Sequence, residues 1–397
     1  SPQEFSYNFF TKRNILMKKR ISILGATGSI GVNALKVVSH LENELEVVYL
    51  SANKNMILLM KQIKKYQPKA VCIVDEESYN QVKEEVQSLN IEILFGRSGL
   101  LELAKRSDVD VMLNALVGAP GMEPTLLAIK AGVDVALSNK ESLVMAGNII
   151  KKAQEQSGAE IFPVDSEHSA IWQCLVGEEL EDLNRIILTG SGGPFRQKEI
   201  SLFSNITVKE ALNHPNWDMG EKITIDSATM MNKGLEVIEA YWLFRIDPDQ
   251  INIIVHPQSI IHSMVEMKDG SVKAQMGVPD MKVPIQYALT YPRHIEATWE
   301  KLDLINCADL TFEKPDYNRF PCIALGFKVL ERFGSSGAAL NLSNDYAVYR
   351  FLNEEIQFTD IPRINESVLE EHPWIEEPSL EDLLELDEWV KNYVTTY

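Results

Sequence analysis

Cysteine is scarce in this 397-residue chain, and its four copies stand far apart, at Cys72, Cys174, Cys307 and Cys322. Without a C-x-x-C pair, the sequence predicts neither a zinc site nor a disulfide framework. A reducing compartment is the simpler interpretation, and we expect a cytoplasmic protein.

Long apolar runs are also missing from the sequence. No stretch reaches the roughly 18 residues that span a bilayer, and the start "SPQEFSYNFFTKRNILMKKR" lacks the apolar stretch of a secretory signal. We therefore expect no membrane partner. Met17 stands just ahead of the first apolar segment and is a candidate natural start, which leaves residues 1–16 as a cloning remnant, a natural extension or a trimmed targeting segment.

Positive charge is in deficit. Lys and Arg number 38 against 57 Asp and Glu, so the net charge is −19. Such a surface repels nucleic acid, and an anionic substrate would need a locally basic pocket. Hydrophobic residues make up 45% and charged residues 24%, which is an ordinary globular composition, and the length suits two or three domains.

Short apolar runs alternate with amphipathic stretches from residue 20 to residue 165. The runs are "RISILG", "LEVVYL", "AVCIV", "IEILF", "DVMLNALV", "DVALS" and "EIFPV". Apolar runs joined by helices indicate a parallel sheet that is covered on both faces. We expect residues 17–164 to form a Rossmann-like, doubly wound α/β domain.

The pattern changes after this first segment. Residues 165–295 combine the strand "NRIILTG", the helix "MMNKGLEVIEAYWLF" and a hairpin that turns at Asp269-Gly270, which predicts an α+β domain. Residues 296–320 have the composition of a linker. Residues 321–397 are amphipathic throughout and predict a C-terminal helical bundle.

A glycine-rich loop follows the first predicted strand. In "ISILGATGSIG", Gly25, Gly28 and Gly31 lie between a strand and a helix, where glycines let the backbone approach a pyrophosphate. A plain glycine-rich turn is the alternative, which the strand-loop-helix context disfavours. The end of the next strand, "LSANKN", offers Lys54 and amides where an NAD site usually carries a carboxylate, so NADPH is preferred over NADH.

Two carboxylates, Asp165 and Glu167, come at the end of the predicted strand "AEIFPVD". Side chains at i and i+2 of a strand share a face, so these two would converge and attract a cation. Oxygen ligands favour Mg²⁺ or Mn²⁺ over zinc. A salt bridge or a helix N-cap remains the alternative.

Four later motifs carry polar groups. "ILTGSGGPF" surrounds Ser191 with glycines, whose consecutive N–H groups form a natural anion nest, and "HPNWDMG" has the composition of a flap over a substrate. "DSATMMNKGLE" puts Lys233 and Glu236 on one helical face, for which a solvated, salt-bridged face is the alternative. In "VHPQSIIHS", His256 and His262 are expected on one strand and one face, either of them a possible structural histidine.

Together these motifs resemble one family, 1-deoxy-D-xylulose 5-phosphate reductoisomerase of the non-mevalonate isoprenoid route. From about residue 18 to the end, eight runs occur in the family's order: "GATGSIG", "SNKESLV", "PVDSEHSAI", "LTGSGGPF", "HPNWDMG", "DSATMMNKGLE", "HPQSIIHSM" and "FPCIAL". The resemblance implies that a homodimer uses NADPH and a divalent metal to convert 1-deoxy-D-xylulose 5-phosphate to 2-C-methyl-D-erythritol 4-phosphate. In a eukaryote it implies a plastid-type organelle.

The resemblance also implies roles for individual residues. The implied metal ligands are Asp165, Glu167 and Glu236. The implied catalytic residues are Lys140, Glu167 and His168. Contacts to the substrate are implied for Ser166, Ser191, His214, Trp217, Met219, Ser227, Asn232, Lys233 and His262. Contacts to NADPH are implied for Gly25, Thr27, Gly28, Ser29, Ile30, Gly31, Lys54, Asn55, Asn139 and Glu141. One departure is Glu221, which stands where the family often carries a basic residue.

Two other hypotheses fit parts of the sequence. Another two-domain NADP-dependent dehydrogenase, acting on a small phosphorylated or amino-acid-derived carbonyl, is compatible with the glycine loop. A semialdehyde dehydrogenase would need a nucleophilic cysteine, and neither it nor a homoserine dehydrogenase explains three carboxylates beside a Ser/Asn/Lys face. An NADPH-sensing regulator without catalysis would be favoured only if Lys233 or a metal carboxylate were missing, and both are present.

Overall fold

A parallel sheet of seven strands forms the first half of the protein. The computed structural model describes residues 17–397, so the expected origins of residues 1–16 lie outside the described residues. The strand order is β4-β3-β2-β1-β5-β6-β7. The strands are β1 (Lys19–Leu24), β2 (Leu45–Ala52), β3 (Ala70–Ile73), β4 (Glu92–Phe95), β5 (Val111–Asn114), β6 (Asp134–Leu137) and β7 (Ile161–Pro163).

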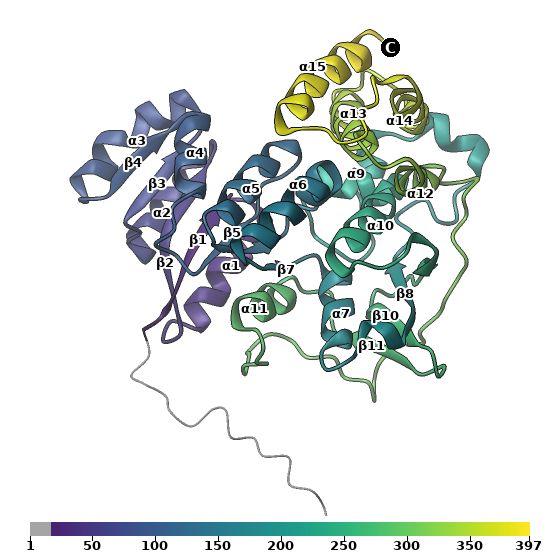
Figure 1. Cartoon of the computed structure of the whole chain (residues 1–397), viewed down its shortest axis with the longest axis horizontal. Helices are drawn as coiled ribbons and strands as arrows, with labels where there is room; N and C mark the ends of the chain where they lie inside the picture. Colours follow the sequence, from purple (N-terminus) through teal and green to yellow (C-terminus); the bar gives the residue numbers. More distant parts are fainter. Residues whose placement is uncertain (1–16) are drawn as a thin grey trace, which may run out of the picture.

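Helices cover both faces of this sheet (Figure 1). They are α1 (Ser29–His40), α2 (Met56–Tyr66), α3 (Glu76–Ser88), α4 (Gly96–Ala104), α5 (Met122–Lys130) and α6 (Glu141–Ser157), with the short 3₁₀ helix η1 (Ala119–Gly121). Neighbouring residues of one strand therefore enter different cores: Val111 packs with one cluster and Met112 with the other. This confirms the doubly wound prediction and explains why the strands are apolar throughout.

A second, mixed sheet of four strands has the order β11-β10-β8-β9. Its strands are β8 (Leu183–Gly190), β9 (Ile251–Val255), β10 (Ile261–Met267) and β11 (Val272–Met276). The predicted hairpin is present, because β10 and β11 pair antiparallel around Asp269-Gly270. The prediction that His256 and His262 share a strand is wrong: β9 ends at Val255, and His262 lies in β10.

Helices surround this second sheet and carry most of the polar motifs. They are α7 (Ser166–Leu175), α8 (Val208–Ala211), α9 (Glu221–Thr229), α10 (Met231–Phe244) and α11 (Lys282–Thr290), with the 3₁₀ helices η2 (Leu180–Asp182), η3 (Ile200–Asn205) and η4 (Pro248–Gln250). The last part of the chain forms α12 (Cys322–Arg332), α13 (Ser336–Leu352), α14 (Asp360–Glu371) and α15 (Leu380–Thr396), the predicted bundle (Figure 1).

One helix from the second half packs against the first sheet. Helix α11 lies beside α1, and its Ile285, Ala288 and Leu289 join the same apolar cluster as Ile21. Lys19 Nζ also donates to the carbonyl oxygen of Leu289 at 3.1 Å. Residues on both sides of the expected boundary at 164 and 165 thus share one core.

Two further observations concern the chain as a whole. Within residues 17–397, no helix has both the length and the apolar character required to cross a membrane. All four cysteines, each within this part of the chain, are free thiols.

Candidate active site

Three carboxylates converge where the two halves of the protein meet. Asp165 is the N-cap of α7, Glu167 lies in the first turn of that helix, and Glu236 projects from α10. One oxygen of each lies within 4.8 Å of the others. The sequence therefore predicted the cluster for the wrong reason, because β7 ends at Pro163 and it is a helix start that brings Asp165 and Glu167 together.

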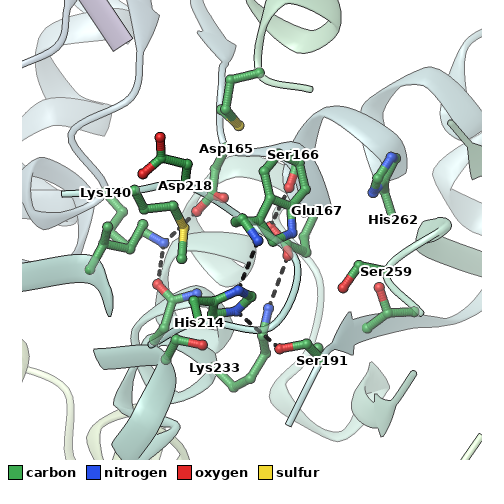
Figure 2. Close-up of a pocket in the computed structure, with 18 of the residues that line it drawn as sticks. Lys140, Asp165, Ser166, Glu167, Ser191, His214, Asp218, Lys233, Ser259 and His262 are labelled. Atoms are coloured by element: carbon green, nitrogen blue, oxygen red, sulfur yellow. Dashed lines mark hydrogen bonds and ion pairs between the residues drawn. The ribbon is translucent and has the colours of Figure 1, made fainter. Parts of the chain in front are cut away.

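Two lysines approach these carboxylates (Figure 2). Lys140 Nζ lies 2.6 Å from Asp165 Oδ2 and 3.5 Å from Glu236 Oε1. Lys233 Nζ lies 3.2 Å from Glu167 Oε1 and also pairs with Glu236. If all three carboxyl groups were ionised, the two ammonium groups would leave one negative charge in excess inside the protein.

The incomplete charge balance appears in the titration of Glu167. Burial raises the pKa of Glu167 to about 8, the nearby Glu236 carboxylate adds to the rise, and Lys233 only partly opposes it. When one carboxyl group of a buried cluster keeps its proton at neutral pH, the cluster has too little positive charge nearby to stabilise all of its members in the ionised form. The oxygen donors of Asp165, Glu167 and Glu236 therefore fit a hard divalent cation.

His168 lies behind the carboxylates and does not line the cavity. Its side chain is fully buried, and Nε2–H donates to the backbone oxygen of Glu236 at 2.9 Å. Its Nδ1 lies 3.2 Å from Glu239 Oε2 and 3.6 Å from Asp165 Oδ2. Burial alone would lower the pKa of His168, but Glu239 and Asp165 raise it to about 9. In this structure His168 has no surface facing the cavity, and its implied catalytic role stays a prediction.

A cavity of about 140 Å³ opens in front of the carboxylates. All nine residues with implied substrate contacts line it: Ser166, Ser191, His214, Trp217, Met219, Ser227, Asn232, Lys233 and His262. Lys140, Asp165 and Glu167 line it as well. The sequence interpretation gave no role to Ser138, Asp218 and Ser259, although they lie inside quoted motifs, or to Ile223 and Met281, which lie outside them.

The hydroxyl of Ser191 is oriented by two donors, of which Figure 2 shows His214. His214 Nδ1 accepts the backbone N–H groups of Asn216 and Trp217 at 3.0 and 2.9 Å, so the proton of the neutral ring is on Nε2. That Nε2–H donates to Ser191 Oγ at 3.2 Å, and Gly193 N–H donates to the same oxygen at 3.1 Å. With both lone pairs engaged, the hydroxyl proton of Ser191 is available to a ligand in the cavity.

The start of α10 supplies an amide and an ammonium group to the same cavity. Asn232 Nδ2 donates to Glu236 Oε1 at 2.8 Å, and its Oδ1 accepts from Lys140 Nζ at 2.5 Å. The stem of Lys233 crosses closely over Gly190, where an added Cβ would lie 2.7 Å from Lys233 Cε. The expectation that Asn232, Lys233 and Glu236 share a helical face is confirmed, but the face is inside the protein.

A second cavity, of about 720 Å³, lies at the glycine loop. Gly25, Thr27 and Gly28 line it, together with Ser51, whose Oγ accepts Gly25 N–H at 3.0 Å. Ser29 and Ile30 line the first cavity instead, so the two cavities meet at the start of α1. The opposite wall includes Leu383, Leu384 and Asp387 of α15, which no sequence signal connects with the loop.

Five residues with implied cofactor contacts have other surroundings. Gly31 lets α1 pack on the loop, since an added Cβ would lie 2.2 Å from Gly25 O. Asn55 caps α2 by accepting Leu58 N–H at 3.1 Å. Its neighbour Lys54 is exposed, and Asn53 lines the cavity in their place. The other two, Asn139 and Glu141, flank Lys140: Asn139 donates to the backbone oxygens of Leu116 and Gly118, and Glu141 pairs with Lys222.

Comparisons with known proteins agree along nearly the whole chain. Residues 21–147 match the family model for 1-deoxy-D-xylulose 5-phosphate reductoisomerase, and residues 161–244 and 276–393 match models for its C-terminal domains. The reductoisomerase of Chloroherpeton thalassium is 52% identical over 376 residues, which cover 95% of this chain and 97% of the relative. That of Halothermothrix orenii is 48% identical, with coverage of 94% and 97%.

Solved structures give the same result. A crystal structure of DOX-P reductoisomerase in complex with NADPH, fosmidomycin and magnesium has a TM-score of 0.91 at 40% identity, and the match covers 95% of this chain and 98% of the other. The Zymomonas mobilis enzyme in complex with NADPH has a TM-score of 0.88 at 40% identity, with coverage of 96% and 99%. The chain belongs to the 1-deoxy-D-xylulose 5-phosphate reductoisomerase family.

Proposed function

We propose that the protein converts 1-deoxy-D-xylulose 5-phosphate to 2-C-methyl-D-erythritol 4-phosphate, with NADPH and Mg²⁺ or Mn²⁺. The family match over nearly the full length supports this reaction. The observation that carries it here is the buried group of Asp165, Glu167 and Glu236, which when fully ionised has one negative charge more than its two lysines balance, beside a cavity that meets the glycine-loop cavity.

Each side chain then has a distinct task. Asp165, Glu167 and Glu236 would hold the cation, which when bound supplies a Lewis acid for the ketone and adjacent hydroxyl of the substrate, while NADPH supplies the hydride. Lys140, 2.6 Å from Asp165, keeps a proton and a positive charge beside the reacting oxygens. Burial alone would lower the pKa of Lys140, but Asp165, Glu236 and Glu239 together raise it well above its usual value.

A second group of side chains in the cavity suits a phosphate. Ser191 offers its hydroxyl proton, Ser227 a second hydroxyl, and Lys233 a positive charge. Trp217 and Met219 line the cavity from the segment before α9 and would exclude water from the bound sugar. Binding energy gained at the phosphate holds the carbon chain in register with the carboxylates.

His168 acts, in this proposal, as a support rather than as a substrate contact. Its two ring nitrogens face Glu236 O and Glu239 Oε2, which fixes α7 against α10. Since Asp165 and Glu167 lie on α7 and Glu236 on α10, this contact sets their separation.

The test is NADPH oxidation by the purified protein. We expect turnover only when 1-deoxy-D-xylulose 5-phosphate and Mg²⁺ or Mn²⁺ are both supplied, and none after chelation until the metal is restored. Oxidation of NADPH that continues without the metal, or no turnover with all components present, would reject the proposed reaction.

We also propose a cytoplasmic homodimer. Four free thiols agree with a reducing compartment, and β11 leaves one edge of the second sheet available to a second copy among the residues described. Light scattering should give about twice the chain mass of 44.8 kDa, and a monomer mass would exclude the dimer.

A further inference from the structure

A buried ion cluster lies behind the cavity, around Lys222. Its Nζ lies 2.7 Å from Asp226 Oδ2, 3.0 Å from Glu141 Oε1 and 3.3 Å from Asp345 Oδ1. The lysine side chain is 16% exposed, so water screens these charges little. Helices α6, α9 and α13 each contribute at least one member.

Asp345 connects the cluster to the cofactor cavity. Its Oδ2 accepts the backbone N–H of Ala119 at 3.1 Å. Gly118 adopts a φ of +75° beside it, and an added Cβ would lie 3.0 Å from the same oxygen. The loop of residues 115–118 and the start of η1 line the cofactor cavity, and the loop includes the exposed Val117. The position of this loop thus depends on Asp345.

Lys222 also connects the cluster to the substrate cavity. It follows the segment 214–220 by two residues and precedes Ile223, which lines that cavity along with Trp217. Its neighbour in the cluster, Asp226, accepts Asn344 Nδ2 at 2.7 Å, and Asn344 in turn accepts from Asn365 at 3.1 Å. The start of α9 is therefore anchored on the helical bundle.

We propose that Lys222 is a positioning residue that couples the two cavities. Through Asp345 it joins the end of the segment 214–220 to the cofactor loop. It also pairs with Glu141, which directly follows Lys140 in the sequence. NADPH bound against the loop then strengthens the binding of a phosphorylated ligand under Trp217, and by linkage the reverse holds. This inference rests on the proposed function of the two cavities.

The charges explain why the lysine is required. Burial raises the pKa of Asp345 to about 6, and Glu141 and Asp226 add to the rise, while Lys222 opposes it. Without the ammonium group, three buried carboxylates would repel one another and move apart. The loop, α6 and α9 would lose their common attachment.

The test measures fosmidomycin affinity by isothermal titration in Mg²⁺, with and without saturating NADPH. We expect the unaltered protein to bind this unreactive phosphonate at least about fivefold tighter with NADPH. In Lys222→Met the ratio of the fosmidomycin Kd without NADPH to the Kd with NADPH should fall to about 1. The Kd without NADPH should change less than about twofold. Lys222→Arg should keep a ratio above about 2. Lys328→Met, which breaks a surface pair with Glu366, is the matched control and should keep the full ratio.

Asp345→Asn tests the same coupling if Lys222→Met does not fold. It retains an oxygen for Ala119 N–H but removes the charge that Lys222 faces, so the ratio should again fall toward 1. A full ratio in either variant, or a ratio of 1 in the unaltered protein, would overturn the inference and leave the reaction standing. Failure of the unaltered protein to bind NADPH or fosmidomycin at all would instead contradict the proposed function.

Discussion

At the scale of single residues, the site depends on where protons are held. His214 is neutral because burial, followed by the nearby Lys233 charge, lowers its pKa to about 4. The neutral ring accepts two backbone N–H groups and donates to Ser191, so it directs the serine proton into the cavity. The motif "HPNWDMG" indicated a flap, but no residue pattern could predict this chain of donors, which depends on the fold of residues 190–217.

We expect His214→Phe to reduce kcat/KM for the phosphorylated substrate by about 10- to 100-fold, because two partly buried N–H groups lose their acceptor and Ser191 loses its donor. Activity with 1-deoxy-D-xylulose, which has no phosphate, should change far less. Equal losses with both substrates would show that His214 does not act on the phosphate end.

Glu236→Gln tests the cation site. The amide keeps the shape and the hydrogen bond from Asn232 but removes one of three negative charges, so Mg²⁺ affinity should fall at least ~10-fold. NADPH affinity, measured by fluorescence titration, should remain unchanged since Glu236 does not line the cofactor cavity. A variant with wild-type metal affinity would remove Glu236 from the ligand set.

His262 predicts a pH dependence of stability. Burial, reinforced by His256, lowers the pKa of His262 to about 4. His262 takes up a proton near pH 6.5 in the unfolded chain and near pH 4 in the folded chain. Its contribution to the free energy of unfolding, about 3 kcal/mol, is therefore complete above pH 6.5 and is lost as the pH falls to 4. In urea unfolding, the free energy of unfolding of His262→Gln should decline less between pH 6.5 and pH 4 than that of the unaltered protein. His40→Gln should show the same decline as the unaltered protein.

At the scale of elements, one helix crossing sets the geometry of α10. Gly326 of α12 meets Gly234 of α10, and an added Cβ on Gly326 would lie 2.2 Å from the carbonyl oxygen of Gly234. Helix α10 carries Asn232, Lys233 and Glu236, so this contact positions the site from outside. The sequence predicted both helices from their periodicity, but the glycine pair lies 92 positions apart, and its meeting is a property of the tertiary fold.

Gly326→Ala should therefore separate α10 from α12. We expect a loss of unfolding free energy of about 1–3 kcal/mol, together with weaker Mg²⁺ binding. Lys328→Ala, two residues further along α12 and exposed, should change neither quantity by much. A stable Gly326→Ala variant with normal metal affinity would show that α10 and α12 accommodate the added methyl group without displacing the site.

At the scale of the whole molecule, the negative net charge repels the anionic substrate. The net charge is −19, and the lysines of the cavity are paired with carboxylates, so the long-range field repels a sugar phosphate. With saturating Mg²⁺, raising the salt concentration from about 20 to 200 mM should increase kcat/KM, because it screens this repulsion. A steep fall would indicate a local positive field that outweighs the net charge.

The contact between α11 and α1 determines how the protein can be divided. Composition predicted the parallel sheet correctly, since buried strands are apolar, but it carries no information on which later helix returns to cover the sheet. A nucleotide-binding module excised as residues 17–164 would expose the apolar surface that Ile285 and Leu289 otherwise shield, and it should aggregate when expressed alone. Grafting residues 280–299 onto its end should recover a soluble fragment, so a cofactor sensor built from this enzyme would need that distant helix as part of its sequence.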